Sequence, residues 1–293
     1  MGKSDVAIEL AAALDGQIVN ADAFQVYRGM DIGTAKVLPA QRRGIEHHMV
    51  DVAEVNEDFG VARFQREGRQ ALRRIALSGR PAVVVGGSGL YVRGLLDDLR
   101  FPGTDPAVRS RWEAVLADVG AERLHSMLAR RDACAAAAIS PANTRRVVRA
   151  LEVIEITGGP FPAHFPKSGP LLIPHMTFGL AVDLAGLDVR IASRVREMVC
   201  SGLVEEVADL SRRGLNAAVP AGRAIGYAQM LEHLAGRSSL PEAVAATVTA
   251  TSQYARRQMR WFRADPRVMW LEASVEALST SERILSHITS GRA

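Results

Sequence analysis

The residues at the start of the chain have the types and spacing to bind phosphate. Gly2, Lys3 and Ser4 match the end of the loop G-x-x-x-x-G-K-[ST]. In that loop, backbone amides and a helix N-terminus hold a diphosphate, the lysine neutralises it, and the hydroxyl ligates Mg²⁺. A tripeptide alone often matches by chance, but this one stands directly before a helix expected over residues 3–14. Its position therefore favours a diphosphate site at the N-terminus of that helix.

Two further segments place polar groups where ligands of α/β sheets bind. Asp22 follows a short strand expected over residues 17–21, and Gly86-Gly87-Ser88 ends a strand expected over 82–86. Ligands of open α/β sheets bind at the carboxyl ends of the strands, and the second segment also offers a helix N-terminus to an anion. The structural alternatives stay open, because Asp22 could cap a turn and the glycines could form only a tight connection.

The elements that would position these residues follow an α/β order. The β-branched run at 82–86 predicts a strand buried on both faces, as in a parallel sheet. Alternating strands and helices indicate a doubly wound core, and no strand is expected over 104–157. Asp105-Pro106 starts a helix that Gly120 stops, and Ser140-Pro141 starts the next one. The other expected elements are helices at about 61–78, from about 89, at 187–212 and at 240–263, strands at 176–183 and 268–271, and an irregular stretch at 158–174.

The composition is that of an ordinary globular protein. Of the 293 residues, 48% are hydrophobic and 23% are charged. The net charge of +4 permits a polyanionic partner without requiring one. No apolar run approaches the roughly 18 residues that a membrane span needs. The two cysteines, Cys134 and Cys200, cannot form a disulfide framework, which fits a cytoplasmic location.

Together these segments resemble the tRNA dimethylallyltransferase family. The resemblance runs over about residues 2 to 272 and rests on several long motifs in the family's order. The matching segments are Gly2 to Ser4; Asp22, Gln25 to Tyr27 and Met30 to Lys36; His47 to Asp51; Val85 to Tyr91; Asn143, Arg146 and Arg149 to Val153; Arg190 to Met198; Arg223 to Tyr227; and Thr251 to Phe262.

The resemblance implies an enzyme with a two-part fold. The implied fold is α/β, with a P-loop NTPase-like parallel sheet core over residues 1–103 and 175–293 and an all-helical, tRNA-contacting insertion over 104–174. The implied reaction transfers a dimethylallyl group from dimethylallyl diphosphate to the N6 amine of the adenosine on the 3′ side of the anticodon. The implied cofactor is Mg²⁺, and we expect a monomer with no membrane contact.

The family's site residues carry over to named positions of this chain. Asp22 matches the general base, Ser88 a hydroxyl near the reacting centre, and Arg223 an arginine that reaches the diphosphate. Gly2, Lys3 and Ser4 match the diphosphate loop, with Ser4 on the metal. The positions expected to contact tRNA are Asp22, Ala23, Phe24, Gln25, Ser88, Arg109, Arg145, Arg146, Arg149, Gln253 and Arg256.

The chain departs from the family at its N-terminus. Family members have a strand and roughly G-P-T-x-x before the glycine and lysine, and these are absent before Gly2. We expect the true start to lie upstream, with Met1 standing for an internal valine codon; a decaying gene is the alternative. The short form is then expected to lack phosphate-binding amides and to be unstable and inactive.

Three rival functions stay open. One is a non-catalytic RNA-binding remnant, which the shortened loop favours. The second is an adenylate prenyltransferase, but that class lacks the helical insertion. The third is a small-metabolite kinase, which the motif from Asp22 to Lys36 does not fit.

Several other conspicuous residues are expected to be structural. His47 and His48 are interpreted as structural rather than metal-binding, and Trp261 and Phe262 are expected in the core. The stripe of Gln253, Arg256, Arg260 and Arg263 on one helix face is either a solvated face or a contact with RNA or diphosphate.

Overall fold

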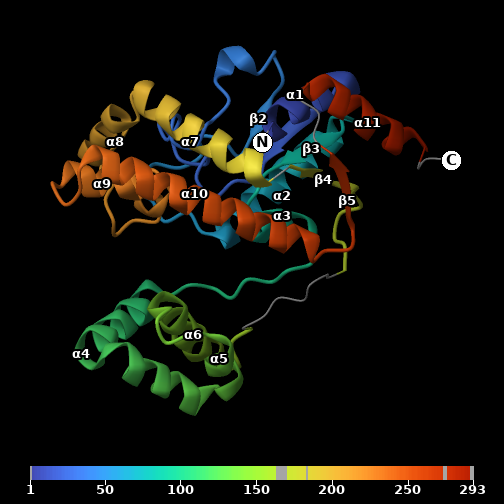
Figure 1. The fold of residues 1–293 in the computed structure, drawn as a ribbon. Helices are drawn as coiled ribbons and strands as arrows, with labels where there is room; N and C mark the ends of the chain where they lie inside the picture. The colour runs from blue at the N-terminus through green and yellow to red at the C-terminus, as the bar shows by residue number, and fades with distance from the viewer. Residues whose placement is uncertain (1, 163–169, 183, 273–275, 291–293) are drawn as a thin grey trace. The chain divides into compact units, whose positions relative to one another are not determined.

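The chain divides into two compact units, which the colours of Figure 1 separate. The computed structural model of the protein describes residues 2–162, 170–182, 184–272 and 276–290. The first unit comprises Met1–Asp98 and Pro170–Ala293, and the second comprises Leu99–Gly169. The second unit thus begins and ends about five residues before the expected insertion of 104–174. Part of the irregular stretch expected at 158–174 lies outside the described residues.

The first unit holds two small parallel sheets. In one, β1 (Gln17–Asn20) lies between β2 (His47–His48) and β3 (Ala82–Val85); in the other, β4 (Thr177–Ala181) pairs with β5 (Val268–Glu272). All these pairings are parallel, and the α/β class with a parallel core is confirmed.

The strand β3 is less buried than its sequence predicts. Every residue of β1 is buried, whereas Ala82 is exposed and the following valines are half-buried. The expectation of burial on both faces for 82–86 is therefore wrong. The reason is position, because among the described residues β3 is an edge strand whose one partner is β1.

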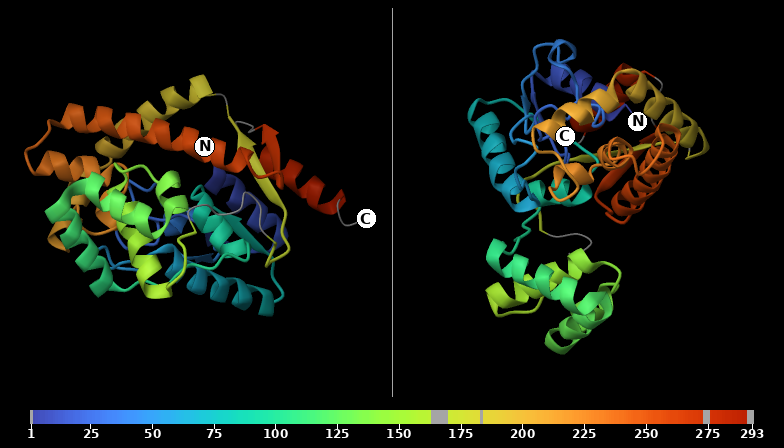
Figure 2. Two further views of the ribbon diagram at one scale, coloured as in Figure 1. Left: turned by 90° about the horizontal axis from the view of Figure 1, so that it is seen from below. Right: turned by 90° about the vertical axis from the view of Figure 1, so that its left-hand side faces the viewer.

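Helices surround these sheets (Figures 1 and 2). They are α1 (Lys3–Leu14), α2 (Val61–Leu77), α3 (Gly89–Leu96), α7 (Leu184–Cys200), α8 (Leu203–Arg212), α9 (Tyr227–Leu234), α10 (Leu240–Arg263) and α11 (Ala277–Ser290), with short 3₁₀ turns at Pro39–Gln41 and Ala221–Arg223. The single helix expected over 187–212 is two helices, because Gly202 adopts a left-handed conformation (φ 97°) between them. No described helix is long and apolar enough to cross a membrane.

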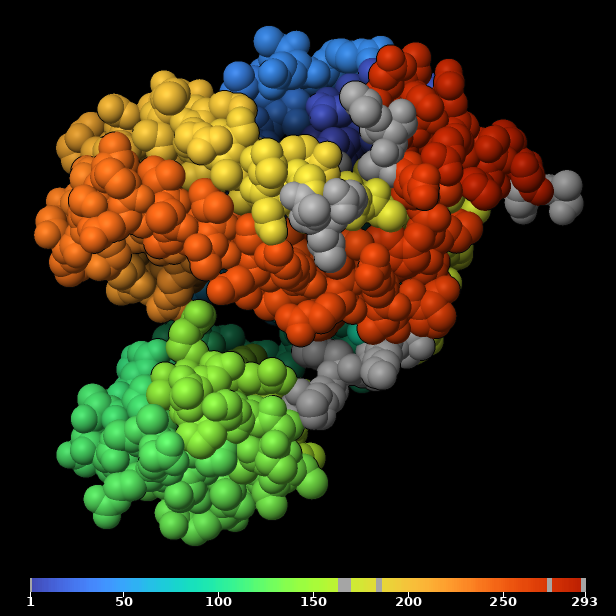
Figure 3. All heavy atoms as spheres, in the orientation of Figure 1, coloured from blue at the N-terminus to red at the C-terminus, as the bar shows by residue number. Residues whose placement is uncertain are grey.

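Local signals explain where the long helix α10 begins and what it packs against. Ser239 accepts from the amide of Glu242, whose carboxylate accepts from the amide of Ser239, and Pro241 lies in the first turn. The helix packs along α7 and against α9. In Figure 3, α9 and α10 form a continuous face of the first unit.

The second unit is helical, with α4 (Pro106–Arg131), α5 (Ala133–Ala138) and α6 (Thr144–Thr157). The Asp105 side chain caps α4 as predicted, and Gly120 (φ 79°) kinks the helix rather than ending it. The helix expected to start at Ser140-Pro141 starts instead at Thr144, because the Asn143 side chain accepts from the amide of Arg146 and caps it. Gly158, left-handed at φ 67°, ends it.

A buried carboxylate organises this unit. Glu152 is fully buried, and its oxygens accept from the Asp105 amide at 3.0 Å and from the guanidinium groups of Arg109 and Arg149, each at 2.9 Å. Arg149 also donates to the carbonyls of Pro102 and Gly103. Glu152 therefore ties the incoming linker to both long helices.

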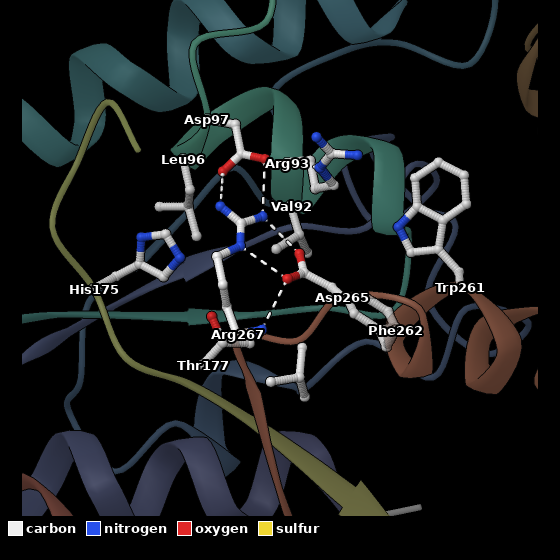
Figure 4. Close-up of a pocket in the computed structure, with 11 residues that line it drawn as sticks. Val92, Arg93, Leu96, Asp97, His175, Thr177, Trp261, Phe262, Asp265 and Arg267 are labelled. Atoms are coloured by element: carbon white, nitrogen blue, oxygen red, sulfur yellow. Dashed lines mark hydrogen bonds and ion pairs between the residues drawn. The ribbon is translucent and has the colours of Figure 1, made fainter. Parts of the chain in front are cut away.

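A second ionic cluster lies where the chain leaves the first unit (Figure 4). Arg267, directly before β5, lies between Asp97 and Asp265 and donates to both carboxylates at 2.6–3.0 Å. Burial opposes the charge on Asp97, but the hydrogen bonds from Arg267 and Arg93 outweigh it and hold the pKa of Asp97 below its usual value. Beside this cluster the two linkers meet, with the Asp98 amide 3.1 Å from the Pro170 carbonyl.

We expect the stability of the second unit to depend on the hydrogen bonds and ion pairs of Glu152. Glu152→Gln should lower its free energy of unfolding by about 3 kcal/mol, because two arginines lose their buried counter-charge. Chemical denaturation followed by circular dichroism measures this. Glu122→Gln, an exposed change in the same unit, should cost no more than about 0.5 kcal/mol. Equal losses in the two variants would contradict a special role for Glu152.

Candidate functional site

Asp22 begins the loop that follows β1. Its Oδ1 accepts from the amides of Phe24 at 2.9 Å and Gln25 at 3.3 Å, so the carboxylate does close the local turn. Burial raises the pKa of Asp22, while these amides and the charge of Lys3 lower it, and the net shift is upward. The carboxylate is thus a stronger base than an ordinary aspartate.

Lys3 brings a cation to Asp22 from a different element. It is the first residue of α1, after Gly2 in a left-handed conformation (φ 63°). Although the residue has exposed surface, desolvation lowers the pKa of Lys3. Asp22 raises that pKa and Arg194 lowers it, so both charges lie within electrostatic reach of the ammonium group. The start of α1 and the end of β1 thus form one charged site.

Ser4 lies on the side of this site that faces Gln25. The two side chains line one small cavity, together with Asn20, Lys36 and His47. Besides hydroxyl, amide and imidazole groups, the lining includes the cations Lys36 and Arg42 and several aliphatic side chains. Among the described residues, no group of three or more His, Cys, Asp or Glu side chains could hold a metal ion.

Gln25 is fixed by its neighbours. Its side-chain amide donates to the backbone carbonyl of Thr34 at 3.0 Å, and its backbone carbonyl accepts from the Asp51 amide at 3.2 Å. Its own amide donates to Asp22. Gln25 and Asp22 therefore belong to one hydrogen-bonded loop.

The buried Lys36 side chain joins three parts of that loop by hydrogen bonds. Its ammonium donates to the Tyr27 carbonyl at 2.9 Å and to the carboxylates of Asp31 and Asp51, each at 2.6 Å, and its side chain is only 3% exposed. All three donors are satisfied. Ala35 (φ 50°) and Asp51 (φ 56°) adopt left-handed conformations beside it, which indicates strain that this interaction holds in place.

Ser88 lies at the N-terminus of α3, covered by α10. Its Oγ is 3.2 Å from the hydroxyl of Tyr254. A Cβ added to Gly87 would collide with the Gln258 side chain, and one added to Gly89 would collide with the Trp261 indole. Gly89 is therefore needed for the rigid indole to lie so close, whereas the flexible end of Gln258 could move away from a side chain at position 87.

Trp261 does not lie in the core. The residue is 42% exposed, so the expectation for Trp261 is wrong, while Phe262 is half-buried. The close approach to Gly89 leaves much of the indole at the surface.

Tyr91 connects the two halves of the site. Burial is the main cause that raises the pKa of Tyr91, and the charges of Asp22 and Tyr254 also raise it. Tyr91 therefore lies within reach of both groups, and Tyr254 in turn contacts Ser88. Electrostatic effects on pKa link Lys3 with Asp22 and Tyr91 with both Asp22 and Tyr254, and one hydrogen bond links Tyr254 with Ser88.

Other predicted site residues have other partners. Arg223 donates to the carbonyls of Ala217 and Ala218, beside a hollow of about 270 Å³. Arg256 pairs with Asp188 at 2.6 Å at the surface, and Gln253 is exposed. Arg109 and Arg149 bind Glu152, whereas Arg145 and Arg146 are exposed.

The two histidines have structural partners. His47 Nδ1 lies 2.9 Å from the Ile45 carbonyl, and His48 Nε2 lies 2.7 Å from Gln17 Oε1. Burial lowers the pKa of both imidazoles, which favours their neutral forms.

Sequence analysis assigned no site role to Tyr254, Lys36 or Arg194. Tyr254 and Lys36 were visible only as members of longer motifs, because their partners are distant in sequence. Arg194, on α7, lowers the pKa of Lys3 by its charge, and no spacing within either segment indicates that influence.

Comparisons with known proteins agree with one another. The model of the family described as "IPP transferase" matches residues 25–265. A protein named tRNA dimethylallyltransferase from Kineococcus radiotolerans is 51% identical over 97% of this chain and 92% of its own length. One of the same name from Mycobacterium tuberculosis is 50% identical over 97% and 93%.

Solved structures give the same picture. A tRNA isopentenylpyrophosphate transferase from Bacillus halodurans is similar with a TM-score of 0.71 and 36% identity, covering 99% of this chain and 92% of that one. A eukaryotic dimethylallyltransferase acting on tRNA has a TM-score of 0.74 over 98% and 77%, and at 23% identity it supports the fold alone.

The raised pKa of Asp22 predicts how Asp22→Asn changes stability with pH. At low pH both proteins carry a neutral side chain and should be about equally stable. As the pH rises through the ordinary aspartate pKa of about 3.9 towards the raised folded value, the unfolded wild type ionises first, so wild type loses stability relative to the variant. Chemical denaturation across this range measures the difference.

Asp209→Asn controls for the loss of a negative charge, because Asp209 forms an exposed pair with Arg212. A difference between wild type and Asp22→Asn that shrinks as the pH rises would show that the Asp22 carboxylate is stabilised, not desolvated, in the folded protein.

Proposed function

We propose, because the chain belongs to the IPP transferase family, that it transfers the dimethylallyl group of dimethylallyl diphosphate to the N6 amine of an adenosine in tRNA. The adenosine would be the one on the 3′ side of the anticodon, and the reaction would be cytoplasmic. One observation carries the assignment of roles: Asp22 lies just after the end of β1, where its carboxylate accepts from two backbone amides, and the charge of Lys3 at the start of α1 acts on its pKa.

The proposed step is a substitution at the allylic carbon. The bond from this carbon to the diphosphate oxygen breaks as the bond to N6 forms, and the proton from N6 passes to the Asp22 carboxylate. The diphosphate leaves with the bonding electrons. An exocyclic amine is a weak nucleophile, so removal of its proton during attack lowers the barrier. The raised pKa of Asp22 makes it a better acceptor for that proton.

The diphosphate would lie at the N-terminus of α1. Lys3 supplies a positive charge there, and free amides of the first turn point outward from the helix. Arg194 adds a second cation within reach of Lys3. These groups stabilise the charge that develops on the leaving group. Arg223 would have to leave its carbonyl partners to take the role that the family suggests.

Mg²⁺ fits the residues around Ser4. Magnesium keeps several waters and is often held by one or two protein oxygens together with phosphates. The Ser4 hydroxyl, in a cavity shared with Asn20 and Gln25, can supply one such oxygen. Lys36 and Arg42 line the same cavity, so the ion would be held mainly by the diphosphate and water. When bound, the ion would help to neutralise the diphosphate.

The target base would enter between the Asp22 loop and α10. Ala23, Phe24 and Gln25 follow Asp22, the proposed proton acceptor, and would line one side of the entering adenine. Ser88 would offer its hydroxyl from the other side. An adenosine in the anticodon loop must leave its stack to reach a pocket of this kind. Gln253 and Arg256 lie on the exposed side of α10, where they would contact RNA.

The second unit would bind the tRNA backbone. Arg145 and Arg146 are exposed at the start of α6 and are the stronger candidates for phosphate contacts. Arg109 and Arg149 are 33% and 26% exposed, so they could contact RNA only with the donors that Glu152 leaves accessible. An adenylate prenyltransferase would have no need of this unit.

A transfer assay tests the proposed function. Protein, dimethylallyl diphosphate, Mg²⁺ and unmodified tRNA are incubated, and mass spectrometry of the digested RNA reports the prenyl group. Asp22→Ala should lower the rate by about 10²–10⁴-fold, the usual contribution of a general base. Asp209→Asn should retain the wild-type rate. A wild-type protein that binds tRNA but never transfers would support the non-catalytic RNA-binding alternative.

Salt dependence tests the tRNA surface. Replacing Arg145 and Arg146 by alanine should weaken tRNA binding and lower the slope of log K against log salt by about 1–2, because each lost phosphate contact removes about 0.7–0.9. The matched double variant replaces Arg123 and Arg130, which are exposed on α4. Equal effects of the two doubles would indicate nonspecific attraction.

A further inference from the structure

A carboxylate from α8 binds three successive backbone amides of the loop described above. Glu206 Oε2 accepts from the amides of Asp31 at 3.1 Å and Ile32 at 2.8 Å, and Oε1 accepts from that of Gly33 at 3.4 Å. Three amides that point to one anion form a strong, directional contact. Glu206 is 173 to 175 residues away in the sequence, so this contact joins distant parts of the chain.

Tyr227 holds that carboxylate in place. The tyrosine is fully buried, and its hydroxyl donates to Glu206 Oε1 at 2.6 Å. Burial and the charge of Glu206 both raise the pKa of Tyr227, so its proton stays on the hydroxyl. A Cβ added to Gly33 would collide with the Tyr227 ring. Glycine at this position therefore lets the ring lie directly on the loop.

The loop connects the amides bound by Glu206 to Asp22. Thr34, next to the clamped amides, accepts from the Gln25 side chain at 3.0 Å, and the Gln25 amide donates to Asp22. The same helix α8 also covers the loop elsewhere, because Leu210 packs close to Gly29. A short series of hydrogen bonds thus runs from α8 to the proposed base.

We propose that Glu206 and Tyr227 are positioning residues for the transfer reaction, fixing the loop that presents Gln25 and Asp22 to the adenosine. This inference rests on the proposed function. Neither residue would touch a substrate. Weakening the contact of Glu206 with the loop amides would let Asp22 move away from the attacking amine. The positions of Lys3 and Ser4 on α1 would not change. The loss should therefore fall on kcat and on the KM for tRNA, and not on the KM for dimethylallyl diphosphate.

Tyr227→Phe is the mild test, since it keeps the ring on Gly33 and removes only the hydrogen bond to Glu206. Glu206→Gln is the stronger test, since it places an amide NH₂ group among amide donors. We expect kcat to fall about tenfold in the first variant and about 100-fold in the second, the scale that small misplacements of a catalytic group produce. The double variant should lose little more than Glu206→Gln alone, because both residues act through one contact.

Glu205→Gln is the matched control, an exposed neighbour on the same helix. Thermal unfolding shows that each variant is folded at the assay temperature, and hydrogen exchange of peptides covering 22–36 reports the loop directly. Faster exchange there with a fall in kcat supports the inference. Variants that lower only the melting temperature, with kcat within twofold of wild type, would overturn it.

The exchange measurement also separates the two hypotheses. If wild type transfers nothing, the proposed function fails, but unchanged exchange over 22–36 in Tyr227→Phe and Glu206→Gln would still overturn the positioning role. Active wild type with unaffected variants overturns the positioning role alone.

Discussion

The loop that carries the site depends on one buried ammonium group. Burying a charge is costly unless it is paired and hydrogen-bonded, and Lys36 meets that condition with three acceptors, two of them carboxylates. The two aspartates would repel each other without the lysine between them. Ala35 and Asp51 keep unfavourable backbone conformations only because this centre over-determines them. The Lys36 ammonium group therefore holds together the segment that runs from Asp22 to Asp51.

Charge in this protein is used for architecture more than its composition suggests. Arginine, abundant in the sequence, invites an interpretation as RNA-binding surface. In the structure, Arg267 lies between Asp97 and Asp265, while Arg109 and Arg149 share Glu152. An arginine bound to a buried carboxylate loses part of its fork of donors to that partner. Which arginines remain for RNA is decided by the position of buried acids.

What could be predicted from the sequence is what neighbouring residues decide. The Asp105 cap, the start of α10 at Ser239 and the strands around Asp22 and Ser88 follow from local signals, and the motifs identified the family correctly. The half-exposure of β3 and the surface position of Trp261 depend on which elements pack beside them. Likewise, the partners of Arg223 and Ser88 lie on segments whose approach no local pattern records. Local elements and family membership were therefore easier to predict than the tertiary contacts between distant segments.

The meeting of the two linkers has an evolutionary consequence. The chain leaves the first unit at Asp98 and returns at Pro170, and these residues are already hydrogen-bonded to each other. A tight turn could therefore join these two residues in place of the whole helical unit. The helical unit is thus a separable module, which an ancestral core could have gained, exchanged or lost in a single genetic event without refolding around the change.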